Sequence, residues 1–401
     1  MTESVETRTP DGRPVPEAEA GEWQALHVFY TGSTRPILTQ AIRPLLDRLT
    51  EEGLVTGYFF LNYWLEGPHI RVRFKPVSKA AEAEVRARAE EAVGAFLRER
   101  PALYEVKSDF YRELYNSLFD LEFSDEERKP YLGEDGRMRL RPINTFSWEP
   151  YAPEYGKYGG PAGVELAEWH FKHSADLVMD AMRTTNVHVR TVLFGFASQL
   201  MMVMTTGFLR ERDAMADYLW RYHQFWYRSF SGTDLISGGV YDRTYESVAE
   251  GVRGRFDTVR GAYDAGATDQ LPGFMRTWAD HCAELREKAV RLAVNGDLTF
   301  RAWGGERQET VTDPDQALQI LLSPYMHMTN NRLHVTIRDE AYLSYVLARS
   351  LRDTAPPQDF GPLQGSGSPR DFGAPQDSET VRDSGPVQGF EPLPESAEAA
   401  S

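Results

Sequence analysis

Cysteine is almost absent from this chain of 401 residues, which contains only Cys282. A single thiol excludes an intrachain disulfide framework and a four-cysteine zinc site. No basic segment followed by an apolar core comes after Met1, so we expect no secretory signal peptide. These absences are typical of a reducing compartment, and we expect a cytoplasmic protein.

Basic charge is also scarce. The sequence holds 44 Lys and Arg against 60 Asp and Glu, a formal net charge of −16 at pH 7. Much of the excess acid lies at the ends, in residues 1–22 and 355–401. Phosphate recognition needs clustered Lys and Arg, so we expect binding neither to nucleic acid nor to an anionic membrane. Net charge does not exclude a local cationic pocket.

Only one hydrophobic run approaches the length of a membrane span, TVLFGFASQLMMVMTTGFL at residues 191–209. Polar side chains interrupt it at Ser198, Gln199, Thr205 and Thr206. We therefore predict a buried core helix and no membrane helix.

The two ends lack the hydrophobic periodicity of folded segments. Residues 1–21 are rich in Glu, Pro, Thr and Gly, and residues 355–401 repeat Asp-Phe-Gly and Pro-Gln-Asp units among Pro, Gly and Ser. Such segments bury too little apolar surface to offset the cost of ordering the backbone, so we predict two disordered tails. Residues 22–354 are then one folded domain.

Residues 22–158 show the pattern of a small sheet. Strand patterns cover 22–30, 55–66, 69–76 and, after a charged loop, 137–151. Helical spacing covers 35–53, with Gly53 as a natural stop, and 77–100. The second and third strands form a hairpin through Glu66-Gly67-Pro68. The order β-α-β-β-α resembles a split βαβ, ferredoxin-like unit.

Helical spacing dominates from about Pro161 onward, with a boundary near Gly159-Gly160. We predict helices at 163–185, 188–209, 212–230, 243–264, 271–294 and 314–353. The last opens with Asp313 and Pro314, a good N-cap and first-turn pair. The predicted fold class is α+β, a ferredoxin-like sheet region (about 22–158) followed by a mainly helical region (about 159–354).

Three short stretches carry polar groups suited to chemistry. In HIRVRF, strand alternation places His69, Arg71 and Arg73 on one face. This face is either a solvated sheet surface or an anion cradle, because Arg forks match carboxylates bidentately. In YAPEYGKYGGP, Glu154 and Lys157 lie three residues apart before a double glycine, which is also the pattern of a surface ion pair.

The third stretch is SPYMHMTNNRLHV, residues 323–335, where apolar residues surround His327, Asn330, Asn331 and Arg332. On a helix His327 and Asn331 share a face, although a histidine among apolar residues is commonly a satisfied core residue. Pro324 predicts a kink or a helix start just before it.

Taken in order, these stretches resemble the C-terminal domain of lanthipeptide dehydratases, also called the thiopeptide-type bacteriocin biosynthesis domain. That family shows an FFxRY…PHxRxR hairpin, an E-x-x-RYGG turn before an E-x-x-F-x-x-DS helix, and an HxxxNRL helix. Here they appear as FFLNY…PHIRVR, EYGKYGG, EWHFKHS and HMTNNRL. The resemblance covers about residues 23–350.

The resemblance implies an enzyme that acts on a precursor peptide and eliminates glutamate from glutamylated Ser or Thr to leave dehydroamino acids. Arg71, Glu154 and His327 match residues implicated in elimination, and Lys157 stands at the usual Arg. His327 would be a base or acid, Arg71 would hold a carboxylate, and Glu154 would orient one of them. His69, Arg73, Asn331 and Arg332 are the expected substrate-binding residues.

Some positions depart from the family pattern. Lys157 keeps the charge of Arg but loses its fork, Asn62 replaces the Arg of FFxRY, and His173 replaces the Asp of DS. Two other roles therefore stay open: a [4+2] cyclase that forms the thiopeptide pyridine, and a non-catalytic subunit that binds a leader peptide or partner enzyme.

The large glutamyl-tRNA-dependent domain of the full dehydratases is not expected in this chain. We therefore expect a stand-alone protein served by a separate glutamylation enzyme, and the resemblance also allows a homodimer. No cofactor and no metal are expected. His170, His173 and Asp176 are too few strong ligands for a metal site, and no nucleophile elbow is present.

Overall fold

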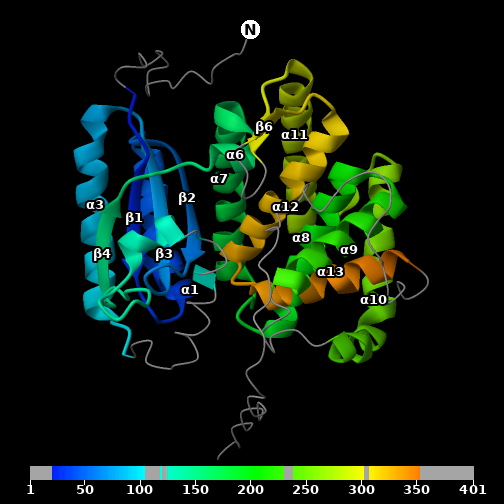
Figure 1. Ribbon diagram of the computed structural model, residues 1–401, viewed down its shortest axis with the longest axis horizontal. Helices are drawn as coiled ribbons and strands as arrows, with labels where there is room; N and C mark the ends of the chain where they lie inside the picture. Colours follow the sequence, from blue (N-terminus) through cyan, green and yellow to red (C-terminus); the bar gives the residue numbers. More distant parts are fainter. Residues whose placement is uncertain are drawn as a thin grey trace, which may run out of the picture.

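A computed structural model describes residues 20–352, except 104–117, 120–122, 124, 230–237 and 302–306. Of residues 228–229 and 238–244 it describes only the backbone. The predicted disordered tails lie outside the described residues, apart from residues 20 and 21. A sheet region and a helical region lie side by side (Figure 1).

The sheet region is a four-stranded antiparallel sheet in the order β2-β3-β1-β4. Its strands are β1 Gln24–Phe29, β2 Val55–Tyr63, β3 His69–Pro76 and β4 Thr145–Glu149. The first crossover holds α1 Thr34–Ile37, the π-helical turn η2 Leu38–Ile42 and α2 Arg43–Glu51, and the second holds α3 Lys79–Glu99. This is the split βαβ arrangement, which confirms the predicted fold class.

The two faces of β3 have different surroundings. Ile70, Val72 and Phe74 have no exposed surface and belong to the core that the α3 side chains Val85, Ala89 and Val93 complete. His69, Arg71 and Arg73 point to the other face, toward the helical region. Strand alternation therefore delivers three basic side chains to the boundary between the two regions.

The helical region consists mainly of long helices packed on one another (Figure 1). They are α7 Gly160–Thr184, α8 Arg190–Leu209, α9 Arg212–Ser229, α10 Gly238–Asp264, α11 Gly273–Asn295, α12 Pro314–Arg332 and α13 Ile337–Leu351. Shorter elements are α5 Asp125–Arg128, η3 Lys129–Tyr131, α6 Tyr155–Tyr158, η4 Thr268–Gln270, β5 Thr299–Arg301 and β6 Gln308–Thr310.

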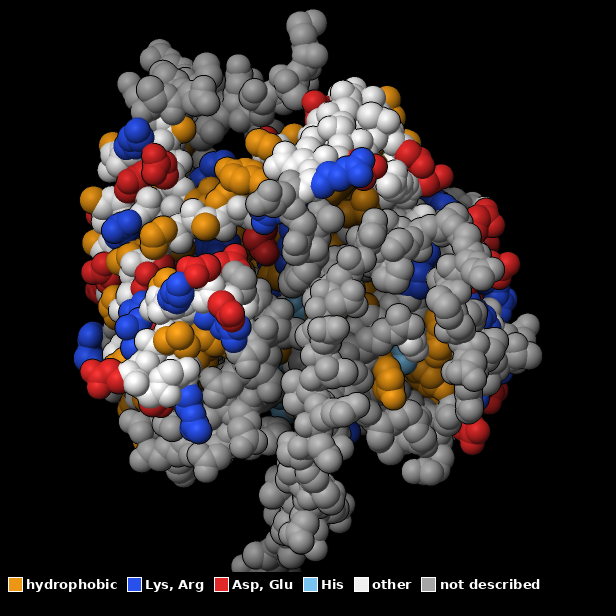
Figure 2. All heavy atoms as spheres, viewed as in Figure 1, with side chains coloured by type: hydrophobic (Ala, Val, Ile, Leu, Met, Phe, Trp, Pro, Cys, Tyr) orange, Lys and Arg blue, Asp and Glu red, His pale blue; other side chains and the backbone are white. Residues whose placement is uncertain are grey.

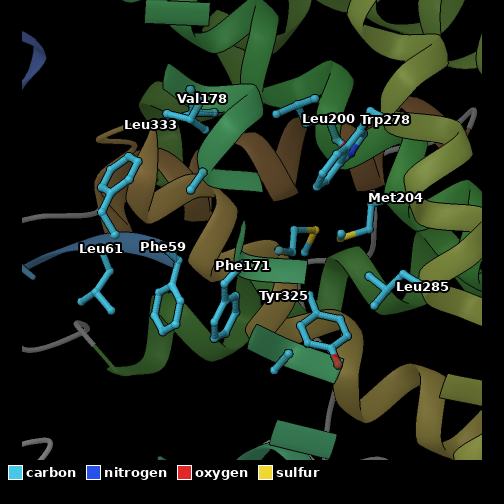
Figure 3. Packing of buried hydrophobic residues seen from close by; sticks show 14 of the residues in the cluster. Phe59, Leu61, Phe171, Val178, Leu200, Met204, Trp278, Leu285, Tyr325 and Leu333 are labelled. Atoms are coloured by element: carbon cyan, nitrogen blue, oxygen red, sulfur yellow. The ribbon is translucent and has the colours of Figure 1, made fainter. Parts of the chain in front are cut away.

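One hydrophobic core runs through both regions. Phe59 of β2, Phe171 of α7 and Tyr325 of α12 follow one another from the sheet into the helices (Figure 3). The rings of Phe59 and Phe171 are 5.3 Å apart between centroids. Because α7 and α12 both contact β2, they fix the distance between the sheet and the other helices.

Among the described helices, α8 alone is long and apolar enough to cross a membrane, and 67% of its most apolar window is buried inside the protein. It contacts α10, α11 and α12, and Leu200, Val203 and Met204 are buried there. The burial predicted for this segment is confirmed.

The prediction of a single helix over 314–353 was wrong. The chain breaks after Arg332: His334 adopts a left-handed φ of 62°, and the Thr336 side chain caps α13 by accepting from the Asp339 N–H. Hydrophobic spacing continues across the break and hides it. At the other end, the Asp313 cap is confirmed, since its side chain accepts from the Asp315 N–H. Pro324 lies inside α12.

Other boundaries also differ from the predictions. Of the strand pattern over 137–151, only Thr145–Glu149 pairs in the sheet, because the residues before it form a loop that binds the β2–β3 turn. The stop at Gly53 is confirmed by a φ of 67°. Gly159 and Gly160 both have positive φ, and a Cβ on Gly159 would lie 3.0 Å from side-chain atoms of Leu298 and Phe300.

Candidate functional site

Arg71 and Arg73 lie two residues apart on β3, partly exposed and facing the helical region. Arg71 donates from Nε to His69 Nε2 at 3.0 Å, and its guanidinium lies 3.6 Å from the centroid of the Tyr63 ring. The Arg73 guanidinium lies 4.4 Å from the Tyr151 ring and 5.3 Å from the Phe59 ring. Both cations are therefore held by aromatic faces.

Arg332 brings a third guanidinium to the same place from the end of α12. The residue has no exposed surface, lies 4.7 Å from the Phe171 ring and donates from Nη1 to the Met328 carbonyl. Its Nε and Nη2 atoms, like Arg73 Nε, have no hydrogen-bond partner in the part of the chain that the structure describes. We call Arg71, Arg73 and Arg332 the arginine cluster.

The arginine cluster lacks a direct counter-charge. Within the described residues, no Asp or Glu forms an ion pair with any of the three arginines. Burial, together with repulsion from Arg73, lowers the pKa of Arg71 to about 10 and that of Arg332 to about 9. Burial also lowers the pKa of Arg73. An anion arriving here would relieve this repulsion and supply the missing hydrogen-bond acceptors.

Glu154 and Lys157 lie at the edge of this cluster. The carboxylate and the Lys157 Nζ are 3.4 Å apart, and the Glu154 side chain is 60% exposed. The Glu154 charge acts on Arg71 and Arg73 from beyond contact distance, where it favours their charged forms. Glu154 opens the turn α6, and the two glycines after it let the chain pass close to β5, through a bond from the Thr299 N–H to the Gly159 carbonyl.

His69 supports Arg71 from behind. The ring is buried, its Nδ1 donates to the Gly67 carbonyl at 2.8 Å, and its Nε2 accepts from Arg71. Burial, with repulsion from Arg71, lowers the pKa of His69 to about 3, so the ring is neutral. His27 stacks on it at 5.0 Å, and burial lowers its pKa to about 2. Both ring nitrogens of His69 therefore have protein partners, Gly67 and Arg71.

His327 lies in a second polar group, together with Glu340 of α13. Nδ1 of His327 and a carboxylate oxygen of Glu340 are 2.8 Å apart. Glu340 has no exposed surface and also accepts from Asn330 Nδ2 at 2.9 Å and from the Tyr222 hydroxyl. The His327 side chain is 25% exposed and has Trp226 beside it at 5.0 Å. We call His327, Glu340, Asn330 and Tyr222 the histidine group.

Asn331 joins α12 to the free edge of β2 through an amide that mimics a peptide. Its Oδ1 accepts from the Asn62 backbone N–H and its Nδ2 donates to the Asn62 carbonyl, both at 2.9 Å. The Asn62 side chain donates in return to the Asn331 carbonyl at 2.7 Å. An edge strand otherwise leaves these backbone groups without protein partners. We call these three hydrogen bonds between Asn331 and Asn62 the bracket, because they hold α12 on the sheet. Asn62 stands where the family pattern has Arg.

The predicted site residues therefore fall into two groups on either side of this bracket. No hydrogen bond or ion pair connects His327 with Arg71, Arg73, Arg332 or Glu154 in the described ranges. His327 and Arg332 lie five residues apart on α12, a rise of about 7.5 Å along the helix axis. On the face shown in Figure 2, acidic and basic side chains intermingle over the described surface. The positive charge of the arginine cluster is therefore not part of a larger basic patch on that face.

Sequence reasoning missed Glu340, Tyr222 and the rings that hold the arginines. Glu340 directly follows Arg338 and Asp339 and precedes the apolar stretch AYLSYVL, a pattern that is equally typical of an exposed acidic first turn of a helix. Tyr222 carries no signal either, because it lies 118 residues away from Glu340 in the chain. His170, His173 and Asp176 turn to different partners: His281, the Trp169 carbonyl, and Arg43 with Tyr58. No group of three or more potential metal ligands occurs among the residues described.

Comparisons with known proteins place the chain in a family. The family model described as "Lantibiotic biosynthesis dehydratase C-term" matches residues 23–351. A search of curated proteins found no match.

Three solved structures are similar to this chain. The pyridine synthase TbtD from thiomuracin biosynthesis has a TM-score of 0.66 and 20% identity, over 83% of this chain and 98% of its own. TsrL has a TM-score of 0.58 and 18% identity, over 83% and 95%. The tRNA-dependent lantibiotic dehydratase MibB from Microbispora sp. 107891 has a TM-score of 0.45 and 18% identity, over 84% of this chain and 28% of its own. At these identities the similarity to TbtD and TsrL shows the fold alone.

Proposed function

This chain belongs to the lantibiotic biosynthesis dehydratase C-terminal family, and from that premise we propose that it eliminates glutamate from glutamylated Ser or Thr residues of a precursor peptide. The observation that carries the proposal is the arginine cluster. Three guanidiniums gather at one place without an acidic partner in the described chain, and a carboxylate-bearing leaving group would supply that partner.

The elimination proceeds without an external electron donor or acceptor. A base removes the proton from Cα of the glutamylated residue, and its electron pair forms the Cα–Cβ double bond. The Cβ–O bond breaks and glutamate departs as a carboxylate. We propose that no metal or organic cofactor takes part.

The two polar groups would divide this work. His327, oriented by a carboxylate on Nδ1 and accessible to solvent, would take the Cα proton. Arg71 and Arg73, partly exposed, would hold the departing carboxylate, while the buried Arg332 would add to their field. Lys157 would stabilise the enolate-like oxygen from the edge of the cluster. The substrate would then span the bracket made by Asn331 and Asn62.

A second candidate function is the formation of a pyridine ring from two dehydroalanines. It is favoured by length and fold, since this chain covers 98% of the thiomuracin pyridine synthase chain at a TM-score of 0.66. A cyclase would also need a general acid and base, which His327 would provide. It would have less use for a carboxylate clamp, and the arginine cluster therefore favours elimination.

One experiment separates these functions. The full chain is incubated in parallel with a glutamylated precursor peptide and with a precursor that already contains dehydroalanines, and products are identified by mass spectrometry. Release of free glutamate from the first peptide supports elimination. Loss of the leader peptide and water from the second shows cyclisation and overturns it. Binding of both peptides without turnover overturns both reactions and leaves a non-catalytic, peptide-binding role.

A further inference from the structure

Glu340 is a buried carboxylate that no Lys or Arg of the described chain neutralises. It lies on α13 with no exposed surface, and its only ion-pair partner among those residues is His327. An isolated carboxylate in such a place would cost several kcal/mol of folding free energy. Glu340 is not isolated, because hydrogen-bond donors surround its carboxylate.

Three donors from two helices converge on this carboxylate. His327 Nδ1 donates to one oxygen, while Asn330 Nδ2 and the Tyr222 hydroxyl donate to the other. Burial and the negative charge of Glu340 raise the pKa of Tyr222 well above its ordinary value, so its hydroxyl keeps its proton and remains a donor. The carboxylate is thus fixed in orientation before any substrate binds.

This arrangement determines which nitrogen of His327 is free. Because a carboxylate can only accept, the Nδ1 of His327 carries a proton, and in the neutral ring Nε2 is the nitrogen with the lone pair. Glu154, the other carboxylate considered for this role, is mostly exposed and pairs with Lys157. No described cation competes with His327 for Glu340.

We infer that Glu340 is a positioning residue that holds His327 in the Nδ1–H tautomer and stabilises the imidazolium formed when Nε2 takes a proton. The consequence for turnover rests on the proposed function. In the reaction, the proton moves from the substrate Cα to His327 Nε2, and Glu340 remains ionised throughout. Asn330 and Tyr222 hold Glu340 in turn.

The test compares Glu340→Gln with a matched control, Asp339→Asn. Asp339 is the neighbouring buried acid on α13, but it pairs with Arg190. Nitrogen-15 NMR of histidine-labelled full chain, with the His327 signals assigned by loss in His327→Gln, reports the tautomer. We expect the Nδ1–H form in the wild type and in Asp339→Asn, and a shift toward the Nε2–H form in Glu340→Gln, because the glutamine amide can donate to Nδ1.

Turnover gives an independent measurement. Glu340→Gln should lower kcat about 10²-fold or more with little change in KM, and Glu340→Asp should recover part of that loss, whereas Asp339→Asn should not change kcat. An unchanged His327 tautomer in a folded Glu340→Gln variant would overturn the inference, and so would a loss of kcat that Asp339→Asn shares. If the wild type turns over neither peptide, the proposed function fails while the tautomer measurement still decides the role of Glu340.

Discussion

Buried charge is satisfied in opposite ways on the two sides of the α12–β2 bracket. In the histidine group, the Glu340 carboxylate accepts from three donors and has no exposed surface. In the arginine cluster, two partly exposed guanidiniums and a fully buried one are held by aromatic faces, and several nitrogen atoms lack acceptors within the described chain. One side is complete without a ligand and the other is not.

This difference separates internal support from ligand binding. A protein gains nothing in stability from an uncompensated buried cation, since its desolvation cost is not offset by a partner. Such a group is therefore a candidate for contact with an anion from outside. A buried carboxylate whose two oxygens both accept hydrogen bonds is a candidate for positioning its neighbours. Each group can be broken separately, and the expected effects differ in kind.

The largest effect should come from removing His327, the proposed proton acceptor. We expect His327→Ala to lower kcat about 10²- to 10⁴-fold on whichever peptide the wild type converts, because general-base assistance is lost.

Arg71→Ala should instead raise KM as well as lower kcat. Arg71→Lys should recover only part of the lost activity, because Lys has no planar fork of donors. Steady-state kinetics by mass spectrometry measures both. His173→Gln, an exposed histidine of α7, is the control and should keep wild-type kinetics. Equal effects on kcat alone for His327→Ala and Arg71→Ala would contradict this division of roles.

The next effect is on stability, with opposite signs on the two sides. Glu340→Ala should lower the free energy of unfolding by about 3–5 kcal/mol, because the donors around the carboxylate lose their partner. Arg332→Met should be neutral or should raise it by about 1–4 kcal/mol, because a methionine fills the space without an unpaired charge. Urea unfolding followed by circular dichroism gives both values. A destabilisation of several kcal/mol in Arg332→Met would show that the arginine cluster is internally compensated after all.

The sequence predicts this comparison only in part, for reasons that particular residues make clear. The β2–β3 hairpin, the stop at Gly53 and the cap at Asp313 depend on neighbours in the chain, and all are confirmed. Strand alternation is equally local and places Arg71 and Arg73 on one face. The break after Arg332 was missed because hydrophobic spacing continues through it.

The long-range contacts could not be predicted in the same way. Nothing near His327 in the sequence identifies Glu340 as its partner, since the two lie on different helices joined by the unforeseen break. Asn331 has the right residue type for substrate binding and for bracing a strand edge, and only the fold distinguishes these. Pairing across elements is set by tertiary packing, which a local pattern does not contain.

The bracket itself gives a smaller effect. Asn331→Ala removes the two hydrogen bonds that the Asn331 side chain makes to the Asn62 backbone and leaves an edge N–H and C=O without those partners, so we expect a loss of about 1–3 kcal/mol of unfolding free energy. Asn331→Asp is the sharper variant, because it still accepts from the Asn62 N–H but faces the Asn62 carbonyl with a negative charge. Urea unfolding should rank wild type above both variants. Equal stability of Asn331→Ala and wild type would mean that the bracket does not hold α12 on the sheet.

The smallest effect is on stability at acid pH. It arises from His27 and His69, the buried histidines next to Arg71. The pKa of His27 is lowered to about 2 and that of His69 to about 3, chiefly by burial and then by Arg71, so the native state stays neutral where the unfolded chain takes up protons. Stability from each ring is fully present above its ordinary pKa of about 6.5 and is lost as pH falls toward these lower values, by about 1.4 kcal/mol per pH unit.

Comparing the pH dependence of unfolding free energy in wild type and in His27→Gln separates the contribution of His27 from those of the other buried histidines. Between pH 7.5 and pH 5.5, the unfolding free energy of wild type should fall by about 1.4 kcal/mol more than that of His27→Gln, which cannot titrate. If His27→Gln follows the wild-type curve, His27 does not titrate differently in the two states. The burial of the His27 ring beside His69 would then not contribute to the loss of stability in acid.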